Sequence, residues 1–140
     1  MNPFRFSLEK VLDVRWTVED EAKNNYGQVQ QALFEAEENL ELLKQEKEML
    51  MEVPAQGVSR MQVRYWYLIE LDRQTLQAQN QVWNLKEQVK VMLNQYISAQ
   101  KDRKILEKLE EKQKEAYELE LKLYEQKQLD EMSNRSLMMG

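Results

Sequence analysis

The sequence has 140 residues, of which 32% are charged, and it contains only three Gly and two Pro. These residues, which commonly end helices and strands, are too few for a compact fold of many short elements. Its net charge of −5, with acids and bases interspersed, argues against nucleic acid as the main partner, because phosphate binding needs a concentrated basic face. With no Cys and no His, disulfides, thiol catalysis and the commonest zinc sites are excluded.

The composition predicts an all-α coiled-coil protein. Glu, Lys, Gln, Leu and Ala are enriched, and apolar residues recur every three or four positions, a sustained repeat that argues against disorder. The opening MNPFRFSLEK lacks the apolar core of a signal peptide, and no apolar run approaches the roughly 18 residues of a membrane span. We therefore expect a cytoplasmic protein without a membrane span.

A first helix is predicted over residues 7–50, with Ser7 as its N-cap. Its apolar residues alternate steps of four and three, the pattern of a left-handed coiled coil. This first seam consists of Ala22, Tyr26, Val29, Leu33, Ala36, Leu40 and Leu43.

Toward the N-terminus the same register falls on charged residues, Glu19 and Arg15. Apolar residues are supplied instead by Val18, Val14 and Val11. We therefore expect the seam to change phase near Ala22, with a local change in supercoiling.

The chain is predicted to turn in a loop over 51–59, because this stretch contains Pro54 and Gly57. Ser59 then opens a second helix, and Gln62 can complete a capping box with it.

The second helix is predicted over 60–131, followed by a frayed tail over 132–140. Its seam consists of Leu68, Leu71, Thr75, Ala78, Val82, Leu85, Val89, Met92, Tyr96 and Ala99. A short loop between two long helices predicts a long antiparallel two-helix hairpin, a single unit over 1–140, with Leu33 near Ala78. A long parallel dimer shares the same seam pattern.

The second helix is the longer one, so we expect it to overhang the first from near Lys104. Two apolar stripes run along this overhang. One consists of Ile105, Leu109, Ala116, Leu119 and Leu123, and the other of Leu106, Tyr117, Leu121 and Tyr124. We expect the second stripe to lack a partner within the hairpin and to be free for binding.

Aromatic residues mark a second candidate surface. Tyr65, Trp66 and Tyr67 are consecutive, so at least one must face outward, either as flank packing or as a binding anchor. Trp16 and Trp83 are expected to pack against the seam.

No catalytic, metal or cofactor site is predicted. The chain has no Gly-rich phosphate loop. Neighbouring carboxylates such as Glu110 and Glu111 point about 100° apart on a helix, which favours solvated surface over acid–base chemistry. An enzyme is the least favoured class.

Three stretches resemble the FliJ family of flagellar type III export proteins. The first consists of Phe4, Phe6, Leu8, Leu12 and Arg15, and the second of Tyr67, Leu68 and Leu71. The third consists of Arg103, Lys104, Leu106, Glu107, Lys108 and Leu109, continued by Glu125, Gln126, Lys127, Leu129, Asp130 and Glu131. Their order and spacing around the loop make the chain similar to that family along nearly its full length.

The resemblance implies a cytoplasmic, non-catalytic component of the flagellar export apparatus, peripherally associated with the inner face of the cell membrane and similar to the stalk of rotary ATPases. Family members bind the export ATPase hexamer, promote its assembly and activity, link it to the membrane export gate and handle export chaperones. The residues implied in ATPase contact are Phe4, Phe6, Leu8, Arg15, Arg103, Lys104, Leu106, Tyr117, Leu121, Tyr124 and Gln126, and those in gate contact are Tyr67 and Leu71. The alternative is a structural coiled-coil tether that self-associates through the overhang.

Overall fold

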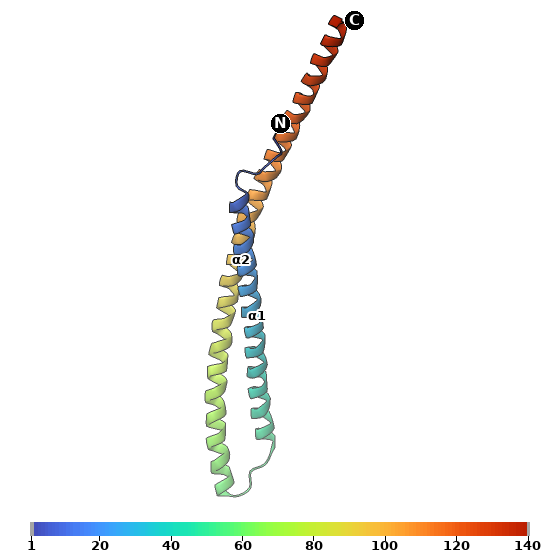
Figure 1. Cartoon of the computed structure of the whole chain (residues 1–140). Coiled ribbons are helices and arrows are strands. Elements are labelled where there is room, and N and C mark those ends of the chain that lie inside the picture. The colour runs from blue at the N-terminus through green and yellow to red at the C-terminus, as the bar shows by residue number, and fades with distance from the viewer. Residues whose placement is uncertain (1, 140) are drawn as a thin grey trace. The chain divides into compact units, whose positions relative to one another are not determined.

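The chain forms a helical hairpin. The computed structural model describes residues 2–139, and these contain two α-helices, α1 (Glu9–Glu52) and α2 (Val58–Met139), with no strand among them (Figure 1). The predicted all-α hairpin is confirmed. None of the helices in this part of the chain has a stretch long and apolar enough to cross a bilayer.

Helix α1 starts two residues later than predicted. The first helical bond runs from the Leu12 amide to the Leu8 carbonyl, with an N–O distance of 2.9 Å, so Leu8 and not Ser7 stands at the cap position. The Ser7 hydroxyl instead donates to Oε1 of Gln113 at 3.4 Å. The prediction of a Ser7 cap is wrong because this hydroxyl faces the other helix.

Helix α2 starts directly after Gly57, whose φ of 87° lies in the left-handed region that glycine adopts without strain. The Met61 amide donates to the Gly57 carbonyl at 3.1 Å, which makes Gly57 the cap. The capping box predicted at Ser59 is therefore misplaced, since the helix has already begun at Val58.

At its other end, α2 continues through Met139, beyond the predicted end at 131. The segment 132–139 contains no Gly or Pro that would stop a helix, which explains why the predicted frayed tail is helical. Gly140, the last residue of that tail, lies outside the described residues.

The chain divides into two compact units. Residues 20–97 form the loop unit, and residues 1–19 together with 98–140 form the terminal unit. In the loop unit the predicted seams of both helices are buried or half-buried at every position. The Tyr26 and Tyr96 rings meet across the seam, with centroids 6.3 Å apart.

The pairing register of the loop unit differs from the predicted one. Tyr26 faces Tyr96, and the two helices run antiparallel. Leu33 lies two turns after Tyr26 on α1, so it faces a position about two turns before Tyr96 on α2 rather than Ala78. Ala78 instead lines a small hollow together with Leu43. The loop explains this shift. Extended chain advances about 3.3 Å per residue, compared with about 1.5 Å in a helix, so the loop carries the chain past the end of α1 before α2 starts.

The aromatic residues of the loop unit are mostly exposed. Tyr65, Trp66 and Tyr67 all reach solvent, which confirms the prediction that at least one of them faces outward. Trp83 is 64% exposed, so the prediction that it packs against the seam is wrong. It projects from the flank of α2, one position beyond the buried Val82.

Candidate functional site

The terminal unit continues the α1 seam through charged residues. Leu8 is half-buried and Leu12 and Glu19 are buried, at intervals of four and seven residues that match the register after Ala22, while Arg15 at the remaining seam position is exposed. The residues expected to replace them in the seam are exposed, namely Val11, Val14 and Val18. The predicted change of phase near Ala22 is therefore wrong.

A paired charge explains why the register continues. Arg103 donates from Nε to Oε2 of Glu19 at 2.6 Å and from Nη2 to Oε1 at 2.9 Å, and the two side chains are only 12% and 7% exposed. Two parallel hydrogen bonds of this kind compensate both charged groups for the loss of water. A carboxylate paired in this way can occupy a buried seam position, whereas an unpaired carboxylate cannot. The hydrogen bonds to Glu19 raise the pKa of Arg103, which holds it in the charged form.

Two more side chains hold Arg103 in place. Its Nη1 donates to Glu107 at 2.9 Å, and its guanidinium carbon lies 4.1 Å from the ring centroid of Trp16, a cation–π contact. Trp16 thus packs against the seam as predicted, although its contact is with a charge. One turn away, Arg15 and Asp102 form a more exposed ion pair at 3.6 Å.

The segment before α1 lies along α2. Phe6 is buried, and the ring of Phe4 contacts that of Tyr117 with centroids 5.6 Å apart. The Tyr117 hydroxyl donates to the carbonyl oxygen of Asn2. Residues 2–8 therefore cover the face of α2 that carries Tyr117.

This cover reverses the expected roles of the two stripes on α2. Leu106, Tyr117 and Leu121 are half-buried, so the prediction that their stripe lacks a partner within the hairpin is wrong for most of its length. The other stripe is exposed throughout. We call it the outer stripe; it consists of Ile105, Leu109, Ala116, Leu119 and Leu123.

The residues implied in ATPase contact all belong to the terminal unit. Those exposed are Arg15, Lys104, Tyr124 and Gln126. Those half-buried are Phe4, Leu8, Leu106, Tyr117 and Leu121, while Phe6 is buried and the Arg103 side chain is nearly so, at 12% exposed. The buried members hold the two helices together, so the free chain offers a partner the exposed members and the outer stripe.

The two residues implied in gate contact lie in the loop unit and differ in exposure. Leu71 is 3% exposed and packs within the seam. Tyr67 is accessible, and its hydroxyl donates to a carboxylate oxygen of Glu46. That hydrogen bond raises the pKa of Tyr67.

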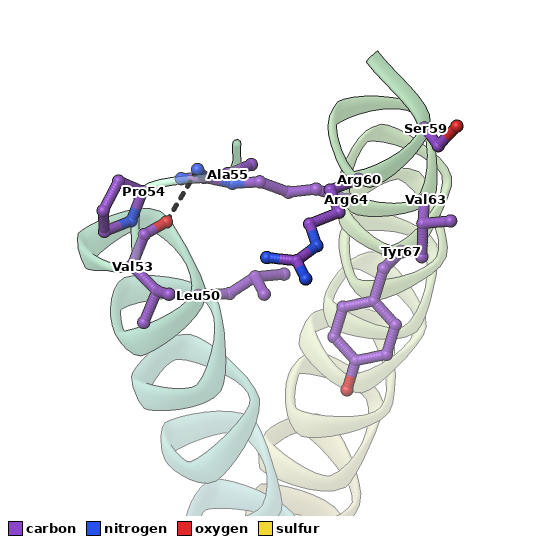
Figure 2. Close-up of a pocket in the computed structure, with 9 residues that line it drawn as sticks. All are labelled: Leu50, Val53, Pro54, Ala55, Ser59, Arg60, Val63, Arg64 and Tyr67. Atoms are coloured by element: carbon purple, nitrogen blue, oxygen red, sulfur yellow. Dashed lines mark hydrogen bonds between the residues drawn. The ribbon is translucent and has the colours of Figure 1, made fainter. Parts of the chain in front are cut away.

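An open, mostly apolar pocket of about 600 Å³ lies beside Tyr67 at the loop (Figure 2). It is lined by Leu50, Val53, Pro54, Ala55, Ser59, Arg60, Val63, Arg64 and Tyr67. Arg64 donates to the Val53 carbonyl at 2.8 Å and to the Met51 carbonyl at 2.9 Å, which satisfies acceptors left open at the end of α1.

Sequence reasoning recognised the outer stripe but not its exposure, and it missed the Glu19–Arg103 pair, for one reason. It counted only apolar residues as seam positions. The available signal was that the four-and-three register lands on opposite charges, Glu19 in one helix and Arg103 in the other.

A sequence model of the family described as "Flagellar FliJ protein" matches residues 4–139. The chain belongs to the FliJ family. Membership makes this FliJ-family chain a flagellar, export-related protein, as the sequence resemblance implied. Comparison with curated proteins and with solved structures gave no match.

Proposed function

We propose that this chain is a non-catalytic stalk of flagellar type III export, which binds the export ATPase hexamer and promotes its assembly and activity. It further links the ATPase to the export gate and to export chaperones at the cytoplasmic face of the membrane. FliJ-family membership supports this role. The observation that carries it is an exposed apolar stripe on a helix that is already paired along another face.

The outer stripe is the proposed ATPase contact. Its large side chains are exposed in one line, where water disfavours them, and they stand among charged neighbours such as Lys104 and Lys108. Covering one leucine in an interface contributes roughly 1.5–3 kcal/mol. We therefore assign contact to the outer stripe with the exposed Lys104, Tyr124 and Gln126, while Phe6 and Arg103 act by holding the helix in place.

A single hairpin cannot match the symmetry of a six-subunit ring. Its contacts must differ from one subunit to the next, so it can favour one catalytic interface over the others. No catalytic residue is required from this chain, because the bias comes from differential binding alone.

Gate contact is proposed at Tyr67, which is accessible and lies beside the pocket at the loop. Leu71 supports this surface indirectly, since it packs in the seam one turn further along α2.

The outer stripe also suits a second function, a tether that self-associates through this face. An exposed apolar line on a helix is the usual seam of a further coiled-coil partner. The two functions differ in their effect on the ATPase, because a tether leaves its turnover unchanged.

The test is to titrate the full chain into an export ATPase and follow ATP turnover. Wild type should stimulate hydrolysis, and Leu119→Ser with Leu123→Ser should weaken the apparent affinity by about tenfold or more. The control is Leu42→Ser with Leu76→Ser, which replaces two exposed leucines of the loop unit and should stimulate like wild type. If wild type forms oligomers that the Leu119/Leu123 variant loses, and neither protein stimulates, the tether is correct.

A further inference from the structure

We propose that the start of α2 and the preceding loop form a binding surface for an anionic lipid bilayer. This loop-end surface consists of residues 53–69 and lies wholly in the loop unit. The inference deepens the proposed placement at the cytoplasmic face of the membrane and rests on that part of the proposed function alone, because contact with lipid requires neither the ATPase nor the gate.

The first turns of α2 expose apolar and aromatic side chains around most of the helix. The exposed set is Val58, Met61, Val63, Tyr65, Trp66 and Tyr67. At about 100° per residue, Val58, Met61 and Tyr65 point to one side, Trp66 to a second, and Val63 with Tyr67 to a third. A peptide or helix partner would cover only one of these sides, whereas a lipid interface surrounds an inserted helix end.

The side facing α1 borders a pocket that is mostly apolar as well. The pocket of about 600 Å³ is lined there by Leu50, Val53 and Pro54 together with Val63 of the third side, and Figure 2 shows Leu50 pointing from α1 toward α2. The loop end thus offers apolar surface on both its outer and inner sides. Water disfavours such surface, and the interfacial zone of a bilayer accepts it.

The charge distribution of the loop-end surface favours an anionic lipid bilayer over a neutral one. Residues 53–69 are the longest stretch of the chain without Asp or Glu, although the whole chain carries a net charge of −5. The same stretch contains Arg60 and Arg64. Arg64 is oriented by the carbonyls of Val53 and Met51, while Arg60 has no ion pair or hydrogen-bonded partner within residues 2–139. Arginine near the surface of an anionic leaflet is attracted to lipid phosphates.

The pair of aromatic residues Tyr65 and Trp66 also favours a membrane interface. The Tyr65 and Trp66 rings contact each other edge to face with centroids 5.8 Å apart, and Trp66 is 68% exposed. Trp and Tyr concentrate at the boundary between headgroups and acyl chains, because each combines an apolar ring with a polar group.

The test is co-sedimentation of the full chain with vesicles of phosphatidylethanolamine and phosphatidylglycerol, compared with neutral phosphatidylcholine vesicles. Wild type should bind the anionic vesicles more tightly than the neutral ones, and less tightly as salt is raised. Arg60→Glu should weaken binding to the anionic vesicles by about fivefold or more and leave binding to the neutral ones unchanged.

Trp66→Glu is the decisive variant, and Trp83→Glu is its control because the two indoles are 68% and 64% exposed on the same helix. We expect Trp66→Glu to lose at least about tenfold in vesicle affinity, as expected for removing one interfacial aromatic anchor, and Trp83→Glu to bind like wild type. Circular dichroism should show equal helicity in all variants, since both positions are solvent-exposed.

Three results would overturn the proposal: no vesicle binding by wild type at low salt, equal affinity for anionic and neutral vesicles, or equal losses in the two tryptophan variants. If vesicles do not bind but Trp66→Glu weakens binding to the cytoplasmic domain of the export gate, the surface is a protein site. Because the vesicle assay contains no ATPase, its failure leaves the proposed stalk function standing.

Discussion

Arg103 and Glu19, separated by 84 positions in the sequence, join α2 to α1 through two hydrogen bonds between nearly buried side chains. A charged pair inside an apolar seam contributes more to specificity than to stability, because its desolvation offsets most of its attraction. Slippage of either helix would leave Glu19 or Arg103 buried opposite an apolar or like-charged neighbour. The pair therefore fixes which residues of the terminal unit meet.

Removing one member of this pair should destabilise the chain more than removing both. Arg103→Ala leaves the Glu19 carboxylate buried without its main partner, whereas Glu19→Leu with Arg103→Leu replaces the pair by apolar packing. Thermal unfolding followed by circular dichroism should rank the midpoints with Arg103→Ala lowest and the double leucine variant near wild type. Lys47→Ala, which breaks the more exposed pair with Asp72, serves as control and should change the midpoint little. A midpoint for Arg103→Ala equal to that of Lys47→Ala would contradict the assignment.

Leu71→Ala should lower the free energy of unfolding by about 2–5 kcal/mol, since it empties a buried seam position. Leu76→Ala, on a side chain that is 59% exposed, should change it by less than about 0.5 kcal/mol. Urea titration measures both. A weaker gate interaction of Leu71→Ala must be corrected for the lower stability of this variant. Tyr67→Ala needs no such correction, because it changes a surface residue.

Thr75→Val should stabilise the hairpin. The Thr75 hydroxyl is buried and has no hydrogen-bond partner among the described residues, and an unsatisfied buried polar group costs about 1–3 kcal/mol. Valine keeps the branched shape at this seam position, so we expect a gain of about 1 kcal/mol in urea denaturation. A loss of stability would show that the hydroxyl has a partner, such as water.

Glu46→Gln should lower the pKa of Tyr67 toward its ordinary value of 10.0, because the carboxylate that accepts the phenol hydrogen bond is what raises it. A raised pKa means that the hydrogen bond stabilises the fold below pH 10 and that this contribution disappears as pH rises through the pKa of Tyr67 in the folded chain. Ultraviolet titration of wild type against Tyr67→Phe isolates this phenol. Glu48→Gln, two residues along α1, should leave the titration unchanged.

Glu70 should retain its charge to unusually low pH. Hydrogen bonds from Arg73, and then from Gln74, lower its pKa from 4.5 to about 2. The corresponding stability is fully present above pH 4.5 and is lost as pH falls toward 2. NMR titration of the Glu70 carboxyl carbon measures this directly, and Arg73→Gln should return the pKa most of the way to its ordinary value.

The sequence predicted the fold and the seams because the four-and-three repeat reports burial directly. Tyr26 and Tyr96 were both recognised as seam residues, yet nothing in either helix encodes the advance of the loop between them, so the partner of Leu33 was misplaced. Glu19 and Arg103 were missed since each is costly to bury alone, and the cancellation depends on a partner far along the chain.

The same error affected the candidate site. Once Arg103 is recognised as a seam residue, Tyr117 falls in the covered stripe and Leu119 in the exposed one. The residues of the terminal unit were identified from the sequence, but which face they turn to solvent followed only from the structure.

The hydrogen bond from Tyr117 to Asn2 gives the hairpin a defined order of assembly. It joins positions 115 apart in the sequence, whereas Arg64 and Val53 are separated by only 11. On the ribosome, Tyr117 is therefore synthesised long after Asn2, so their hydrogen bond forms late, while Arg64 follows Val53 within a few residues. Closing the shorter segment first costs less entropy. In pulse-labelled hydrogen exchange during refolding, amides around Arg64 should gain protection before those around Tyr117, and simultaneous protection would show that the two helices pair in a single step.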